Sequence, residues 1–71
     1  MSVEPGRYVH FKGGEYDVLG VARIADGERE GELAVVYKPR YEVPPPALSV
    51  RSLASWQSPA PDGGPRFRRV D

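Results

Sequence analysis

Residues 8–19 read YVHFKGGEYDVL, two runs rich in β-branched and aromatic residues on either side of the pair Gly13-Gly14. Such runs favour extended strands, and glycine accepts the positive φ values that a two-residue hairpin turn requires. The sequence therefore predicts a β-hairpin with strands over residues 8–12 and 15–19.

The strand pattern continues beyond the hairpin. Between residues 19 and 25 the alternation of apolar and polar residues weakens, so we expect this stretch either to be covered on both sides or to bend at Gly20, as strands do where a small barrel closes. A polar loop, DGEREGE, follows over residues 26–32. Residues 33–38, LAVVYK, then give the strongest strand pattern of the chain and predict a central strand.

Prolines and short segments make up the second half of the chain. Four prolines among residues 39–46 lack backbone donors, so this segment is expected to run extended over the surface. Residues 48–51 predict a short strand. Ser52 can cap a single 3₁₀ or helical turn over residues 53–56. Residues 66–70 predict the last strand.

These elements predict an all-β fold, namely a small SH3-like five-stranded barrel with one short 3₁₀ or helical turn before the last strand. Residues 1–6 are expected to form a flexible lead-in, and residues 7–71 a single small β-barrel domain. A chain of 71 residues and 7.8 kDa is too short for a second core.

Composition limits the classes of function. Ten basic and ten acidic residues give a net charge of zero, so no overall charge favours nucleic acid or an anionic membrane. The absence of cysteine and the single histidine, His10, exclude disulfides, thiolate metal sites and imidazole clusters, and no cofactor is expected. Without a signal peptide or a membrane-spanning run, we expect a cytoplasmic protein with no membrane partner. Because so small a core contributes only about 3–5 kcal/mol, we expect a monomer or a weak homodimer.

The sequence also resembles a known family. Residues 8–23, YVHFKGGEYDVLGVAR, closely resemble the opening of a small bacterial family called domain of unknown function 1653, whose members typically read Tyr-Arg-His-Phe-Lys-Gly and then Tyr-x-Val-Leu-Gly-x-Ala. Residues 33–37 are similar to its Leu-Val-Val-Tyr strand, residues 50–53 to its Val-Arg-Pro-Leu element, and residues 65–67 to its Pro-Arg-Phe ending. The resemblance implies a compact β domain and no particular activity.

Seven aromatic side chains are many for so small a core. Phe11 and Phe67 are expected to fill it. Tyr37 or Trp56 supplies a third core ring, which leaves other tyrosines for a surface groove. Tyrosines beside arginines suit a planar ligand or a proline-rich peptide, although ordinary barrel packing with wetted hydroxyls explains the same composition. Our first hypothesis is therefore a non-catalytic binding module that recognises a small ligand, a peptide or a protein. Its candidate ligand-binding residues are Tyr8, His10, Tyr16, Arg40, Tyr41, Arg51 and Trp56.

The distribution of charge supports a second hypothesis. Residues 1–32 carry a net charge of −3 and residues 33–71 a net charge of +3. A basic face in the second half could contact a few phosphates of RNA or DNA, and an accessory nucleic-acid-binding protein is the alternative function. The same charges are also explained by an edge strand that is protected from pairing with other chains. The candidate residues for this alternative are Lys12, Arg51, Arg66, Arg68 and Arg69.

The third hypothesis is a small hydrolase. In the predicted hairpin His10 lies opposite Asp17 or Tyr16, within reach of a hydrogen bond that either serves acid-base chemistry or simply fixes the register. No motif surrounds a serine, and Gly13-Gly14 precedes a strand rather than the helix that a phosphate loop requires. We therefore expect a protein that is not an enzyme.

Overall fold

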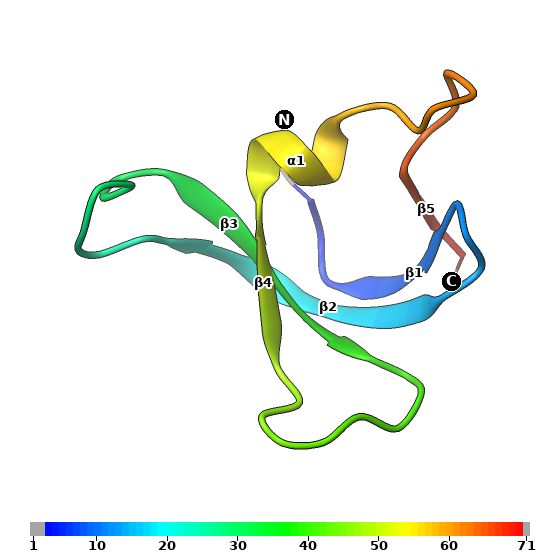
Figure 1. The fold of residues 1–71 in the computed structure, drawn as a ribbon, viewed down its shortest axis with the longest axis horizontal. Coiled ribbons are helices and arrows are strands. Elements are labelled where there is room, and N and C mark those ends of the chain that lie inside the picture. Colours follow the sequence, from blue (N-terminus) through cyan, green and yellow to red (C-terminus); the bar gives the residue numbers. More distant parts are fainter. Residues whose placement is uncertain (1–2, 71) are drawn as a thin grey trace.

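The structure, a computed structural model, describes residues 3–70. Five antiparallel strands form one sheet in the order β4-β3-β2-β1-β5, and one short helix precedes the last strand (Figure 1). The predictions of a mostly β fold and of a helical turn before the last strand are confirmed. The elements are β1 (Gly6–His10), β2 (Glu15–Arg23), β3 (Leu33–Pro39), β4 (Ser49–Ser52), α1 (Leu53–Gln57) and β5 (Phe67–Arg69).

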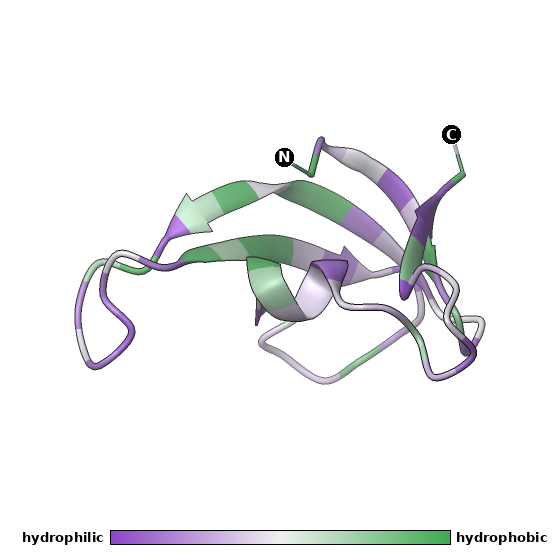
Figure 2. Ribbon diagram, turned by 90° about the horizontal axis from the view of Figure 1, so that it is seen from above, coloured by the Kyte–Doolittle hydropathy of each residue, from purple (hydrophilic) through white to green (hydrophobic). Residues whose placement is uncertain are grey.

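The sheet is open, so the closed SH3-like barrel is not confirmed. Strands β4 and β5 are the two edges of the hydrogen-bonded ladder and do not pair with each other. Helix α1 follows β4 directly and packs on one face of the sheet (Figure 2). From there the ring of Trp56 stacks on Phe67 of β5, with centroids 3.6 Å apart and planes 1° apart. The two stacked rings therefore connect β5 to the helix that follows β4, at the place where hydrogen bonds between β4 and β5 would close a barrel.

The hairpin between β1 and β2 has a longer loop than the sequence predicts. The His10 carbonyl accepts a hydrogen bond from the Gly13 N–H at 2.7 Å, and the His10 N–H donates to the Gly14 carbonyl at 2.8 Å. Phe11, Lys12 and Gly13 thus form a three-residue loop, in which Gly13 has a φ of 102°. This loop type places a glycine at its third position. The predicted two-residue turn and the extension of the first strand to Lys12 are therefore wrong.

Strands β2 and β3 form the centre of the sheet. The register between them shifts between Val18 and Gly20, which confirms the predicted irregularity of the second strand at Gly20. Strand β3 pairs with β2 on one side and β4 on the other, as a central strand should, and Val35 within it is fully buried. The strand also includes Pro39, opposite Tyr16, so the extended segment begins one residue later than predicted.

Helix α1 begins where the sequence places its cap. The Ser52 hydroxyl accepts a hydrogen bond from the Ser55 N–H at 3.1 Å, which satisfies one of the free donors of the first turn. The helix ends at Gln57, and its one buried residue is Trp56. This single turn therefore serves to place Trp56 in the core.

The core differs from the predicted one in its aromatic residues. Phe67 and Trp56 are buried, as expected. Phe11 is 38 % exposed, because it lies in the hairpin loop instead of the strand. Tyr8 is buried in its place, and its hydroxyl donates to the Glu4 carbonyl at 2.9 Å. The main buried cluster consists of Tyr8, Val18, Val35, Trp56 and Phe67.

The lead-in predicted over residues 1–6 is partly in contact with the sheet. Residues 1–2 lie outside the described part of the chain. Val3 packs against the core cluster, and β1 already begins at Gly6. No helix among residues 3–70 is long and apolar enough to cross a membrane.

Candidate functional site

One face of the sheet carries nearly all of the aromatic side chains. Tyr8 pairs with Tyr16, His10 with Phe67, and Val18 with Tyr37, so side chains from four strands point to the same side. Helix α1 and the segment after β3 each add one ring to this side. We call the resulting set the aromatic layer, which comprises Tyr8, His10, Tyr16, Tyr37, Tyr41, Trp56 and Phe67.

The aromatic layer is continuous from the core to the surface. Trp56 contacts Tyr8 edge-on at 5.6 Å and Tyr37 at 5.3 Å, besides its stack on Phe67. Tyr37 in turn contacts Tyr16 at 5.3 Å with the two rings almost perpendicular, at 89°. Edge-to-face pairs of this kind are favourable because the ring edge is positive and the ring face negative. The outer rings are thus held in place by the core.

The outer end of the aromatic layer is a pair of tyrosines. The rings of Tyr16 and Tyr41 lie 5.8 Å apart, and their hydroxyl oxygens are 3.1 Å apart, which makes a hydrogen bond. Burial of Tyr16, together with this hydrogen bond, raises the pKa of Tyr16 to about 12. Tyr41 itself is 53 % exposed. The pair therefore offers solvent an uncharged surface of two rings with polar tips.

His10 lies at the border between the aromatic layer and a group of cations. Its Nδ1 accepts a hydrogen bond from the Lys12 N–H at 3.1 Å, so in the neutral ring the proton is on Nε2. Its ring lies 4.9 Å from Phe67 and 4.4 Å from Phe11. Burial lowers the pKa of His10, and the positive charges of Arg51, Arg66 and Lys12 lower it further. The neutral form of His10 therefore predominates at pH 7.

The predicted pairing of His10 with Asp17 or Tyr16 is wrong. The three-residue loop places His10 level with Gly14, while Asp17 lies opposite Arg7 on the other face of the sheet. The hydrogen-bond partner of His10 comes from its own turn. The hydrolase hypothesis thus loses the His10–Asp17 pair on which it depended.

The pKa of His10 is the first testable consequence of this arrangement. We expect it to lie below the ordinary value of 6.5, and to rise in Arg51→Gln because one neighbouring positive charge is removed. The unfolded chain binds this proton more tightly, so His10 makes the domain less stable as the pH falls below 6.5. An NMR titration of the imidazole signals measures both pKa values.

Arg40→Gln is the matched control for this titration, since Arg40 lies on the other face and is not among the groups that lower the pKa of His10. A His10 pKa at or above 6.5, or equal shifts in the two variants, contradicts the assignment.

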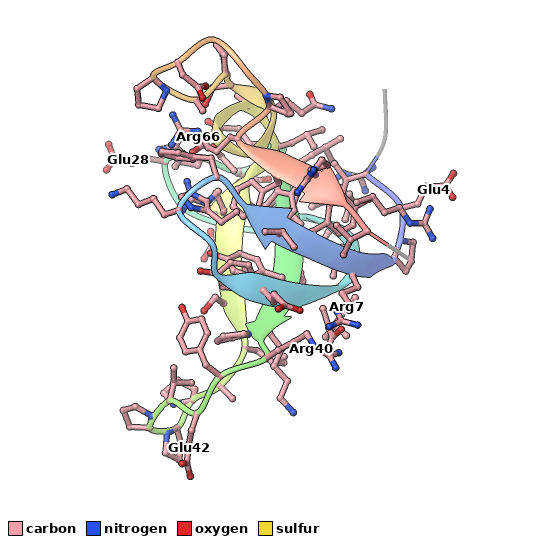
Figure 3. The ribbon with its side chains drawn as sticks, turned by 90° about the vertical axis from the view of Figure 1, so that its right-hand side faces the viewer. Glu4, Arg7, Glu28, Arg40, Glu42 and Arg66 are labelled. Atoms are coloured by element: carbon pink, nitrogen blue, oxygen red, sulfur yellow. The ribbon has the colours of Figure 1, made fainter. Side chains whose placement is uncertain are left out.

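Arg40 does not join the aromatic layer. Its Nη1 lies 2.9 Å from the Asp17 carboxylate, and the neighbouring Arg7 pairs with Glu15 at 2.6 Å. Figure 3 shows Arg7 and Arg40 close together, next to β2. They line a shallow pocket of about 400 Å³ that Tyr41 also reaches. Arg40 therefore belongs to an ion-paired surface next to the candidate site.

Two other predicted binding residues are core residues. Tyr8 and Trp56 are buried, and they support the outer rings. They reach the surface at the margin of one pocket. Of the other predicted residues, the structure brings His10, Tyr16 and Arg51 together around the ring of Phe67, and Tyr41 is hydrogen-bonded to Tyr16.

The five basic residues of the nucleic-acid hypothesis do not form one face. Arg68 pairs with Val9 and points to the face opposite His10, and Arg69 lies 3.9 Å from Glu4. The remaining three gather near His10. Arg66 and Lys12 flank the ring of Phe11 at 5.5 and 5.9 Å, and Arg51 lies 5.3 Å from the ring of Phe67.

Sequence reasoning missed Phe11 as a surface component of the site, because it was expected as a core ring. Tyr37, the alternative core ring, is partly buried against the core cluster. For Phe11 the available signal was the order Phe11-Lys12-Gly13, because a three-residue hairpin loop places glycine third and leaves the first residue exposed.

The fold and the site together define a small antiparallel β-sheet domain with one helical turn and an aromatic face bordered by cations. The chain belongs to the family described as "Protein of unknown function (DUF1653)", whose model matches residues 6–69. The crystal structure of a member of this family from Bordetella bronchiseptica is similar, with 35 % sequence identity and a TM-score of 0.77 over 96 % of this chain and 87 % of that chain. The resemblance of residues 8–23 is thereby confirmed. No curated protein matches the chain.

Proposed function

We propose that this domain is a non-catalytic cytoplasmic binding module, built on an incompletely closed SH3-like sheet, that recognises its ligand through Tyr16, Tyr41 and Arg51. The observation that carries the proposal is the continuity of the aromatic layer, which ends in the exposed ring of Tyr41. Rings that are already held by a core lose little conformational freedom on binding, so they suit a recognition surface.

The position of Arg51 supports the same proposal. Its guanidinium lies over Phe67, and its charge acts on both His10 and Tyr16, so it stands between the two ends of the site. An arginine beside exposed rings combines a cationic group with stacking surfaces. The separation of Arg68 and Arg69 from the other cations favours this module over the nucleic-acid alternative.

Amide NMR spectra test the proposal with three separate additives: a proline-rich peptide, a mixture of mononucleotides and a short single-stranded RNA. We expect one additive to shift the signals of Tyr16, Tyr37 and Tyr41. Tyr41→Ala should weaken that binding at least about tenfold, as the loss of a central aromatic contact does.

Lys38→Ala is the control, because Lys38 is exposed on the opposite face. Equal loss of affinity in the two variants contradicts the proposed surface. Shifts confined to RNA and centred on Arg68 and Arg69 favour the nucleic-acid alternative instead.

A further inference from the structure

Lys12, Arg51 and Arg66 form a cationic cluster around His10 that carboxylates do not balance. Among residues 3–70, no aspartate or glutamate lies within ion-pair distance of these three charges. Elsewhere among these residues four arginines have carboxylate partners, namely Arg7, Arg29, Arg40 and Arg69. Three further cations, Arg23, Lys38 and Arg68, also have none, but they come from three different strands. Lys12, Arg51 and Arg66 differ from them because they converge on His10 and the two phenylalanine rings beside it.

Neutral groups hold the two guanidinium groups of the cluster in place. Arg66 donates from Nε to the Ser58 hydroxyl at 3.1 Å and from Nη2 to the Pro59 carbonyl at 3.1 Å. Arg51 donates from Nη1 to the Ser55 hydroxyl at 3.2 Å, while its buried Nε has no partner among the described residues. These bonds fix the side chains and leave their charge uncompensated. Cations that are oriented in advance by neutral partners favour an incoming anion.

The cluster is directly connected to the exposed rings. Figure 3 shows Arg66 extending from the segment before β5 toward the β1–β2 hairpin, where it lies over Phe11. At the other end of the cluster, Arg51 lies 5.3 Å from the ring of Phe67, and the ring centroids of Phe67 and Tyr16 are 6.0 Å apart. Tyr16 in turn forms a hydrogen bond with the exposed Tyr41. The cations and the outer rings therefore belong to one connected set of side chains.

We propose that the cationic cluster binds the phosphate group of a small phosphomonoester whose planar part lies on Tyr16 and Tyr41. This inference rests on the proposed function and names the ligand class of the same site. A phosphomonoester carries nearly two negative charges at pH 7, which suits three unbalanced cations better than a single carboxylate does. Guanidinium groups bind phosphate oxygens through paired hydrogen bonds, and His10 Nε2–H is a further donor.

The test is a titration with adenosine 5′-monophosphate, inorganic phosphate and adenosine, each followed in amide spectra of the full chain. We expect the monophosphate to shift the amides of Lys12, Arg51, Arg66 and Tyr41, and inorganic phosphate to compete with it. Adenosine alone should bind at least about tenfold more weakly. Arg51→Gln and Arg66→Gln should each weaken monophosphate binding at least about tenfold, because each removes charge-assisted hydrogen bonds.

Lys38→Gln is the matched control and should bind as the unaltered protein does, since it removes one positive charge from the opposite face of the sheet. The competition by inorganic phosphate needs no variant and remains decisive if a substitution impairs folding. Adenosine that binds at Tyr41 as tightly as the monophosphate overturns the phosphate assignment but leaves the binding module standing. No shift with any of the three overturns this inference, and the proline-rich peptide then tests the module separately.

Discussion

Trp56→Ala is expected to leave the domain largely unfolded at 25 °C. The side chain is 4 % exposed and contacts Tyr8, Tyr37 and Phe67. Truncation of a buried aromatic residue to alanine costs about 3–5 kcal/mol. A core in a domain of this size supplies a total of about 3–5 kcal/mol. The loss therefore matches the whole free energy of unfolding, and amide spectra with collapsed dispersion, together with the loss of near-ultraviolet circular dichroism, should show it.

Leu48→Ala provides the comparison, because Leu48 is 54 % exposed and its truncation should change the free energy of unfolding by no more than about 0.5 kcal/mol. Trp56→Phe keeps an aromatic ring against Phe67 and should be less destabilising than Trp56→Ala. A well-dispersed spectrum of Trp56→Ala with an unchanged urea midpoint is incompatible with a core built around this ring.

Val35→Thr should have the second largest effect. Val35 is fully buried in β3, and threonine has nearly the same shape but brings a hydroxyl into an apolar cluster. A buried hydroxyl without a compensating hydrogen bond costs about 1–3 kcal/mol. Urea unfolding, followed by tryptophan fluorescence, should show a lower midpoint with an unchanged slope.

Val50→Thr is the same chemical change in the adjacent strand, at a side chain that is 68 % exposed. It should alter the free energy of unfolding by about 0.5 kcal/mol at most. If the two threonine variants have equal midpoints, Val35 is not the apolar centre of this sheet.

Local patterns were sufficient to predict the strands but not the loop between the first two. The run of residues 33–38 alternates so strongly that β3 follows from it, and Ser52 marks the start of α1 because a side-chain cap acts over three residues. The hairpin loop is different, because Gly13 and Gly14 permit both a two-residue and a three-residue turn. The choice depends on the register that buries Tyr8, and burial is a property of the whole sheet.

That single choice explains most of the errors at the candidate site. Ending β1 at His10 places Phe11 in the loop and turns Tyr8 toward the core, since each shift of register exchanges the two faces of a strand. It also separates His10 from Asp17, so the predicted polar pair disappears. Tyr16, Tyr41 and Arg51 were predicted together from residue type, and the structure brings them together through β2, β4 and the segment after β3.

The closure of the sheet could not be predicted from strand count. Five short strands suit a barrel and an open sheet equally, and the outcome depends on how the edges are covered. In this chain the stack of Trp56 on Phe67 joins β5 to the helix that follows β4, and the pairing of two rings distant in sequence leaves no local pattern.

The position of β1 between β2 and β5 has a consequence for the order of folding. Strand β2 follows β1 after a short loop, whereas β5 is the last element of the chain. The pairing of Tyr8 with Arg69 therefore closes a loop that contains almost all of the other elements. Contacts of such high sequence separation slow folding, because the entropy of closing the chain is lost before the contacts form. During synthesis, the outer edge of β1 and the face of Trp56 that Phe67 covers stay exposed until the residues of β5 have left the ribosome. The nascent chain is therefore most prone to aggregate in this interval.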